Sequence, residues 1–174
     1  MIKDILSLRG EKVLHFETGE ILALLNWPII DPDTGIIEAF WVKPLTLTAR
    51  NAILLTSNIL AFKKNVYIKS DKMICDPTEV LRIAAILDEG REFLYASVQN
   101  EKQKDYGRVY NLSFSTETYV IRQIYSKKSF LGIFPYAQRI FPYERILKVL
   151  PRVIIIDDNN TKKEEVVEAP VELA

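Results

Sequence analysis

Short runs of Ile, Val, Leu, Tyr and Phe, separated by turn residues, set the hydrophobic pattern of this chain. Apolar runs of about four to eight residues, bounded by turn residues, are typical of β-strands. In the first half they predict strands at 12–16, 20–30, 36–42, 52–56 and 66–68, with a loop at 45–51. Tight turns are expected at 17–19 and at 31–35, where Asp-Pro-Asp-Thr-Gly joins the fixed φ of proline to a glycine that tolerates positive φ.

Residues 76–90 follow a helical pattern instead. Asp76 can cap a helix, and Pro77 suits its first turn. Apolar residues three and four positions apart then share one helix face, namely Val80, Ile83, Ala84 and Leu87. Gly90 suits the position just past a helix end. The pattern predicts a helix over 77–88 that packs its apolar face on the strands.

The second half returns to strand patterns. They predict strands at 92–98, 107–114, 119–126, 139–141 and 153–156, with a polar turn at 100–105 and a looser stretch at 127–137. Beyond Asp158 the chain becomes charged and poor in large apolar residues. We expect a disordered tail at 159–174.

The two halves also share a pattern. Residues 31–41 match 115–125 at a shift of 84 positions, and residues 58–62 and 66–68 match 145–149 and 153–155 at a shift of 87. Few residues are identical, so the match lies in hydrophobic pattern and spacing. Such self-similarity is the mark of an internal repeat.

Composition narrows the class of protein. The chain has 174 residues, of which 48% are apolar, so a packed interior is possible, and its net charge is zero. No apolar run reaches the roughly 18 residues that a membrane span needs, and the charged N-terminus does not resemble a signal peptide. Cys75 is the only cysteine, which excludes an internal disulfide and favours a reducing cytoplasm.

The repeat resembles a known family, the PRC-barrel. This small β-barrel occurs in the photosynthetic reaction centre H subunit and in the C-terminal half of a bacterial ribosome maturation factor. Residues 30–37 carry its hairpin motif as Ile-Asp-Pro-Asp-Thr-Gly-Ile-Ile. The second copy has the opening glycine at Gly107 and the hairpin residues Thr116-Glu117-Thr118. Two positions depart from the family pattern, Ala23 for the opening glycine and Tyr119 for the hairpin glycine.

The resemblance implies an all-β protein of two tandem small PRC-type β-barrels joined by a short amphipathic helix. The expected domains are a first barrel at 1–75, a helical linker at 76–90, a second barrel at 91–158 and a disordered tail at 159–174. Because the family is not catalytic, the resemblance implies binding or scaffolding. Fold alone does not define function, so a site must be argued separately.

Catalytic chemistry finds little support in the sequence. His15 is the only histidine and lies in an alternating strand, where it suits a structural or surface role. Asp31 and Asp33 resemble the start of a calcium loop, but Val42 occupies the position of its bidentate Glu. A His/Cys metal site needs more ligands than His15 and Cys75 supply. We therefore expect no enzyme, no metal and no cofactor.

A basic and aromatic segment at 122–152 is the strongest candidate site. It holds seven basic residues and one acid, Glu144, with aromatic residues among them. Such a mixture suits RNA phosphates and bases, although strand alternation alone produces the same mixture. Within it, residues 127–136 are expected to form an apolar loop, either a binding loop or one folded over the barrel end. The candidate residues are Arg122, Lys127, Lys128, Phe130, Phe134, Tyr136 and Arg139.

Two functions are consistent with these observations. The first is a non-catalytic cytoplasmic adaptor that binds a protein partner through the second barrel. The alternative is a factor associated with RNA or ribosome assembly that binds through a basic face of the same barrel. A small ligand inside a barrel is a weaker third reading, since barrels of this size are usually filled by their own side chains.

Overall fold

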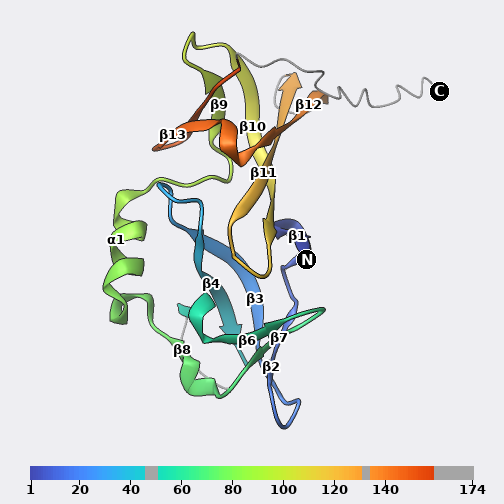
Figure 1. The fold of residues 1–174 in the computed structure, drawn as a ribbon, viewed down its shortest axis with the longest axis vertical. Coiled ribbons are helices and arrows are strands. Elements are labelled where there is room, and N and C mark those ends of the chain that lie inside the picture. The colour runs from blue at the N-terminus through green and yellow to red at the C-terminus, as the bar shows by residue number, and fades with distance from the viewer. Residues whose placement is uncertain (46–50, 131–133, 159–174) are drawn as a thin grey trace, which may run out of the picture. The chain divides into compact units, whose positions relative to one another are not determined.

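The computed structural model describes residues 1–45, 51–130 and 134–158. These residues are mostly β-strand and form two seven-stranded sheets, with one α-helix among them (Figure 1). The protein is therefore mostly β, as the strand pattern predicts. The expected tail at 159–174 and most of the expected loop at 45–51 lie outside the described residues.

The first sheet has the strand order β6-β7-β2-β3-β4-β5-β8. Its strands are β2 (Lys12–His15), β3 (Ile21–Ile30), β4 (Ile37–Pro44), β5 (Ala52–Leu55), β6 (Ile59–Phe62), β7 (Val66–Ile68) and β8 (Ile74–Cys75). Trp27 and Pro28 continue β3 without a break, which agrees with the extended run expected there. The sequence pattern did not predict β6 or the two-residue β8 as strands.

The second sheet has the order β12-β11-β10-β9-β14-β13, and β1 pairs with β10 beside this path. Its strands are β1 (Ile2–Asp4), β9 (Ser97–Asn100), β10 (Asp105–Ser115), β11 (Ile121–Phe130), β12 (Phe134–Pro142), β13 (Ile146–Leu150) and β14 (Val153–Ile156). The sequence pattern does not predict strands β1 and β13.

Six strands of each sheet follow one another in the same order. Strands β6-β7-β2-β3-β4-β5 correspond to β13-β14-β9-β10-β11-β12. Each set has a parallel pair at the same place, β2 with β7 and β9 with β14. A short 3-10 helix precedes β6 at Thr56–Asn58 and β13 at Tyr143–Arg145. A repeated chain would give this agreement.

The correspondence of β7 with β14 differs by one residue from the sequence expectation. Val66 and Ile68 are buried in β7, whereas Ile154 and Ile156 are buried in β14. Side chains alternate between the two faces of a strand, so the buried face fixes the match. Ile68 therefore corresponds to Ile156, a shift of 88 and not 87 positions (68 to 156).

The hairpin that joins β3 to β4 has a counterpart between β10 and β11. Gly35 donates to the carbonyl of Asp31 over 2.9 Å, and Tyr119 donates to that of Ser115 over 2.8 Å. Gly35 has φ 67° and Tyr119 has φ 57°, so both lie in the left-handed region. The side chain of Asp31 caps the first turn and that of Ser115 caps the second. Tyr119 thus keeps the turn that a glycine would make.

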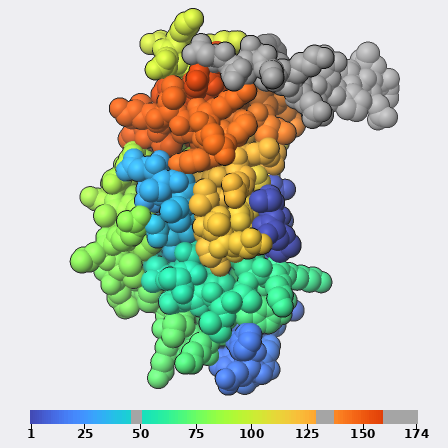
Figure 2. Space-filling model, in the orientation of Figure 1, coloured from blue at the N-terminus to red at the C-terminus, as the bar shows by residue number. Residues whose placement is uncertain are grey.

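The chain divides into two compact units, and each is built from two separate segments of the sequence. The first unit comprises residues 1–90 together with 113–121, the end of the β10–β11 hairpin. Within this unit Ile36 and Val120 form an antiparallel bridge. Figure 2 shows the surface of this hairpin end, in gold, between the light-blue hairpin that follows β3 and the dark-blue N-terminus.

The hairpin end also contributes to the core of the first unit. Phe114 is fully buried, and its ring centroid lies 6.1 Å from those of Phe40 and Phe62. Phe40 and Phe62 meet edge to face with centroids 6.0 Å apart. Aromatic rings at such distances attract one another beyond the area they bury. The three side chains therefore form one aromatic core cluster.

The predicted helix forms as α1 (Leu81–Glu89), preceded by a 3-10 turn at Pro77–Glu79. Asp76 caps that turn by accepting from the backbone N–H of Thr78, and Gly90 ends α1 with φ 63°. The helix packs on the first sheet, mainly through Ile83, which is 1% exposed. Leu87, expected on the same apolar face, is exposed, and Ile86 packs on the sheet in its place.

The second unit comprises 91–112 and 122 onward, with its described part ending at Asp158. Its buried hydrophobic side chains are Phe93, Ala96, Val98, Tyr106, Val109, Leu112, Ile124, Phe141, Val149, Ile154 and Ile156. The strand expected at 92–98 is shorter, because Tyr95 adopts φ 65° and only Ser97–Asn100 is regular strand.

The looser stretch expected at 127–137 is wrong. Residues up to Phe130 belong to β11, and residues from Phe134 belong to β12. The two strands pair directly, with Lys128 opposite Ala137 and Phe130 opposite Phe134. A register shift between Lys128 and Ser129 interrupts the alternation, which is why the pattern looked irregular in sequence.

Candidate binding surface

One face of β10, β11 and β12 in the second unit carries exposed and half-exposed side chains. Alternate residues of β11 and β12, namely Ile124, Ser126 and Phe141, are buried, so the residues between them point to the opposite face. Tyr125 lies opposite Ile140 and Lys127 opposite Gln138 in the ladder. We name this surface the outer face; it consists of Arg108, Tyr110, Gln123, Tyr125, Lys127, Gln138 and Ile140.

Two tyrosines form the centre of the outer face. The rings of Tyr110 and Tyr125 lie 6.3 Å apart and both are half-buried. Lys127 Nζ lies 5.3 Å from the centroid of the Tyr110 ring, within the range of a cation–π contact. The Tyr125 hydroxyl donates to Gln123 Oε1 over 3.1 Å, and the Tyr110 hydroxyl donates to Gln138 Oε1 over 3.4 Å. These contacts hold both rings in place.

Ile140 adds an apolar side chain to this surface. It is 42% exposed although it lies within β12 and pairs with Tyr125 in the ladder. Arg108 is exposed two residues before Tyr110 and therefore shares its face. The outer face thus combines an apolar and aromatic centre with two cationic residues, Arg108 and Lys127.

The structure separates the residues that the sequence analysis grouped as a basic site. Lys127 belongs to the outer face, whereas Lys128 and Arg139 follow the opposite alternation. Lys128 Nζ pairs with Asp105 at 3.4 Å, and the Arg139 guanidinium lies 5.0 Å from the Tyr106 ring centroid. Arg122 is exposed near the start of β11 and alternates with Gln123, so it lies beside the outer face and not on it. The side chains of Phe130, Phe134 and Tyr136 lie outside the described ones.

Arg139 belongs to a polar cluster around Tyr106. The Tyr106 hydroxyl donates to Asp158 Oδ2 over 2.6 Å, and the Asn100 amide donates to the same oxygen over 2.7 Å. These two hydrogen bonds hold the pKa of Asp158 below its ordinary value. Lys104 Nζ lies 5.1 Å from the Tyr106 ring centroid. The hydrogen bonds and cations surround a buried tyrosine, which favours a structural role for the cluster.

Residues considered for catalysis or metal binding have structural partners. His15 Nδ1 accepts from the backbone N–H groups of Glu17 and Thr18, so it caps the 17–19 turn. Asp31 accepts from the backbone N–H of Asp33 and from Arg82. Burial, and then the nearby carboxylates of Glu79 and Asp76, raise the pKa of the Cys75 thiol. A raised pKa keeps the thiol protonated and unreactive.

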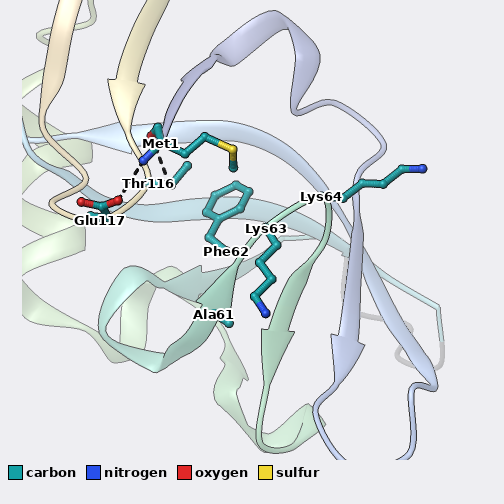
Figure 3. A pocket seen from close by; sticks show the side chains of 7 residues that line it. All are labelled: Met1, Ala61, Phe62, Lys63, Lys64, Thr116 and Glu117. Carbon is teal, nitrogen blue, oxygen red and sulfur yellow. Dashed lines mark hydrogen bonds and ion pairs between the residues drawn. The ribbon is translucent and has the colours of Figure 1, made fainter.

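A depression in the first unit lies between the N-terminus and β6 (Figure 3). The N-terminal ammonium pairs with Glu117 at 3.0 Å, and Phe62 forms the apolar floor. Figure 3 shows the ammonium ends of Lys63 and Lys64 directed away from Phe62. The two lysines therefore do not point into the depression, and the N-terminal ammonium and Glu117 are paired with each other, so the depression is a weaker candidate than the outer face.

Comparison with known proteins provides no family or relative: no protein-family model matches the chain, and no curated protein matches it. Within 1–45, 51–130 and 134–158, no cluster of three or more His, Cys, Asp or Glu side chains could hold a metal ion. The α-helix of the described part is too short and too polar to cross a membrane.

Several residues of the outer face were not singled out from the sequence, among them Tyr110, Gln123, Gln138 and Ile140. Their signal was the period of two along β11, where Gln123, Tyr125 and Lys127 alternate with buried residues. The basic residues of 122–152 come from both faces of the sheet. The alternation of side chains along a strand separates the residues of one face from those of the other.

Proposed function

We propose that this chain is a non-catalytic binding protein that engages a protein partner through the outer face of β10, β11 and β12. The observation that carries the proposal is the exposed Ile140 beside the ordered pair Tyr110 and Tyr125. An apolar side chain in mid-strand gains from being covered, by roughly 25 cal/mol per Å² of area removed from water. The outer face offers such area on paired strands.

The composition of the outer face supports a protein as the partner. Tyrosine and arginine are enriched among the residues that contribute most binding energy to protein interfaces. Such interfaces usually have an apolar centre and a polar rim. Here Tyr110, Tyr125 and Ile140 form the centre, while Arg108 and Gln138 are exposed beside it. The tyrosines are already held by hydrogen bonds to Gln123 and Gln138, so binding would cost little side-chain entropy.

RNA, including RNA of an assembling ribosome, is the alternative ligand for the same unit. Tyr110 and Tyr125 could stack on bases, and Lys127 and Arg108 could contact phosphates. A groove that tracks an RNA backbone needs several cations on one surface. Lys128 and Arg139 are engaged on the opposite face, which makes a protein the better-supported partner.

We also propose that the two repeats are PRC-type barrels that act in the cytoplasm. The shared strand order of the two sheets supports a repeated architecture, and the Asp31–Gly35 turn with its Ser115–Tyr119 counterpart supports the family motif. A single half-buried cysteine of raised pKa suits a reducing compartment.

Affinity capture from native lysate tests the proposed partner class. The bait is the full chain, either unchanged or carrying Tyr125→Ala and Ile140→Lys. Leu60→Lys is the matched control, because Leu60 is also an exposed strand residue, 56% exposed, but lies in the first unit. We expect the double variant to lose protein partners that the control retains, with or without nuclease. Recovery of the same partners by all three baits would contradict the proposal.

Nuclease treatment separates the two ligand classes. Partners that depend on the outer face but disappear with nuclease would indicate RNA. Direct binding to RNA at low salt, lost in Lys127→Glu but retained in Leu60→Lys, would also favour RNA over protein.

A further inference from the structure

The first sheet shows what covers a face of this kind. Helix α1 lies on the face of β3, β4 and β5 that carries Trp41 and Ile53. Ile83 of the helix is 1% exposed, and Val80 and Ile86 pack beside it. Figure 1 shows α1 alongside β4. The helix removes this face from water, and Ile53 is fully buried beneath it.

The outer face of the second unit corresponds to this helix-covered face. Trp41 lies opposite Ile53 in the β4–β5 ladder, and Tyr125 lies opposite Ile140 in the β11–β12 ladder. Tyr125 follows Trp41 by 84 positions (41 to 125), and Ile140 follows Ile53 by 87 (53 to 140), the two shifts of the sequence repeat.

Among the residues that the structure describes, a helix covers only the first of the two corresponding faces. Ile53 is 0% exposed, whereas Ile140 is 42% exposed. No α-helix occurs among the described residues that follow β9, so the described part of the second unit supplies no counterpart of α1. Within the described residues, the second repeat therefore has the face that corresponds to the α1-covered one but no helix upon it.

Charge distinguishes the two faces. Arg82 of α1 donates through Nε to Glu38 Oε1 over 2.8 Å and through Nη2 to Asp31 Oδ2 over 2.7 Å. The position of Glu38 corresponds to Arg122 at the same shift of 84 (38 to 122). Arg122 is exposed. Glu38 and Arg122 are each the second residue of their strand, and both alternate with the residues of the face itself. Arg122 would therefore meet a helix as Glu38 meets Arg82, near the end of the strand, with a positive charge in place of a negative one.

We propose that the outer face docks an amphipathic α-helix of a partner protein, with an apolar stripe on Tyr125 and Ile140 and a carboxylate toward Arg122. The inference rests on the proposed function and names the partner's chemistry. The apolar stripe takes the place of Ile83 and Ile86, and the carboxylate takes the place of Arg82 with the opposite charge. Amphipathic helices bind apolar surfaces through side chains three and four positions apart, the spacing at which Ile83 and Ile86 stand.

Gln123 bears on whether the partner helix binds permanently or exchanges. It corresponds to Ala39, which is fully buried under α1. A glutamine here lets the face remain in water when the helix leaves, because its amide stays hydrated or bonded to Tyr125. A face that is apolar in part and polar in part suits an exchangeable partner better than a permanent one.

The helix α1 provides a probe of known fit. The probe is a synthetic peptide of residues 76–90 with Arg82→Glu, and the control peptide keeps Arg82. Both carry Ala85→Lys linked to Glu89 by a lactam on the exposed side, because an isolated helix this short is unstable in water. Binding to the isotope-labelled full chain is followed by NMR, using the signals of Tyr110, Tyr125 and Ile140.

We expect the Arg82→Glu peptide to bind about fivefold more tightly than the Arg82 peptide, which is the size of an exposed ion pair. In the Arg122→Glu chain the preference should reverse, and Ile140→Lys should abolish binding of both peptides. The Leu60→Lys chain should behave like the unchanged chain.

Three results would overturn the inference. They are no shift at Tyr125 or Ile140 with either peptide, shifts confined to Trp41 and Ile53, and binding that occurs only after residues 159–174 are removed. The second would mean that the peptide replaces α1, and the third that the chain's own segment is the occupant. If the peptides fail while capture of protein still depends on Tyr125 and Ile140, the proposed function stands and the helical partner does not.

Discussion

Gly35 and Tyr119 occupy the same place in two hairpins, and each accepts a hydrogen bond from the strand that follows the other. Ile121 donates to the Gly35 carbonyl over 3.0 Å, and Ile37 donates to the Tyr119 carbonyl over 2.8 Å. The exchange is reciprocal, because Ile37 and Ile121 are themselves corresponding residues, 84 positions apart (37 to 121). The two hairpins thus meet through equivalent groups within the first unit.

The buried ring of Phe114 should make this association essential to the first unit. Phe114→Ala removes a side chain with no exposed area and leaves Phe40 and Phe62 facing a cavity. Phe-to-Ala changes in a core cost about 3–5 kcal/mol. We expect a loss of that size in the free energy of unfolding, measured by urea denaturation. Tyr110→Ala, in the same strand but half-exposed, serves as control and should cost clearly less. Equal losses would contradict the assignment.

Gly107 is required by a close backbone approach. It has φ 91°, and a Cβ built on it would lie 2.3 Å from the carbonyl oxygen of Lys127. Gly107→Ala should therefore destabilise the protein by about 3 kcal/mol, from left-handed strain plus overpacking. Gly19→Ala is the matched control, because Gly19 has φ 71° but no atom within 4 Å of its Cβ position. It should lose only about 1 kcal/mol in the same denaturation experiment. The prediction is wrong if the two variants are equally stable.

The Tyr106–Asp158 hydrogen bond should make stability depend on pH in the acid range. The Tyr106 hydroxyl, and then the Asn100 amide, lower the pKa of Asp158 below its ordinary value of 3.8. A carboxylate of lowered pKa stabilises the fold above the unfolded value, and this contribution is lost as the pH falls through the folded value. Stability should therefore decrease as the pH falls below 3.8.

Tyr106→Phe tests this link without changing the shape of the ring. The pKa of Asp158, followed by NMR of its carboxyl carbon, should rise toward 3.8. The fall in stability at acid pH should become smaller. Tyr110→Phe, which removes a hydroxyl elsewhere in the same strand, should leave the Asp158 pKa unchanged. An unchanged Asp158 pKa in Tyr106→Phe would show that the hydrogen bond is not its cause.

Cys75 should react slowly with alkylating agents. Burial raises the pKa of its thiol above the ordinary value of 9.0, and the carboxylates of Glu79 and Asp76 add to this. Less thiolate is then present near neutral pH. Iodoacetamide should modify the folded chain more slowly than the urea-unfolded chain, with the rate rising at higher pH. Glu79→Gln should speed the reaction moderately, and Glu89→Gln should not. Equal rates in folded and unfolded chains would contradict the prediction.

The sequence predicts those parts of the fold that depend on neighbouring residues. The turn of Asp31 and Gly35, the cap at Asp76 and the helix end at Gly90 are all local, and all are found. The strands within 127–137 are not predicted, because the pairing of β11 with β12 shifts its register between Lys128 and Ser129. The adjacent lysines also hide the alternation of polar and apolar residues. Strand β1 was missed because its pairing with β10 joins residues more than a hundred positions apart.

The candidate surface likewise has a part that follows from neighbouring residues and a part that depends on pairing between distant strands. That 122–152 holds the binding residues remains a prediction, and Lys127 does lie on the outer face. The partners of Lys128 and Arg139, however, come from Asp105 and Tyr106, on another strand. Which side chains are already engaged is decided by register and not by composition.

The membership of residues 113–121 in the first unit limits how the chain can be dissected. A fragment ending at Gly90 would have all seven strands of its sheet but would lack Phe114, and Ile37 would have no acceptor at Tyr119. Although the chain is built from similar halves, expressing the first half alone would cut through its own interior. Engineering the two repeats as interchangeable modules would therefore require grafting the hairpin end together with the first ninety residues.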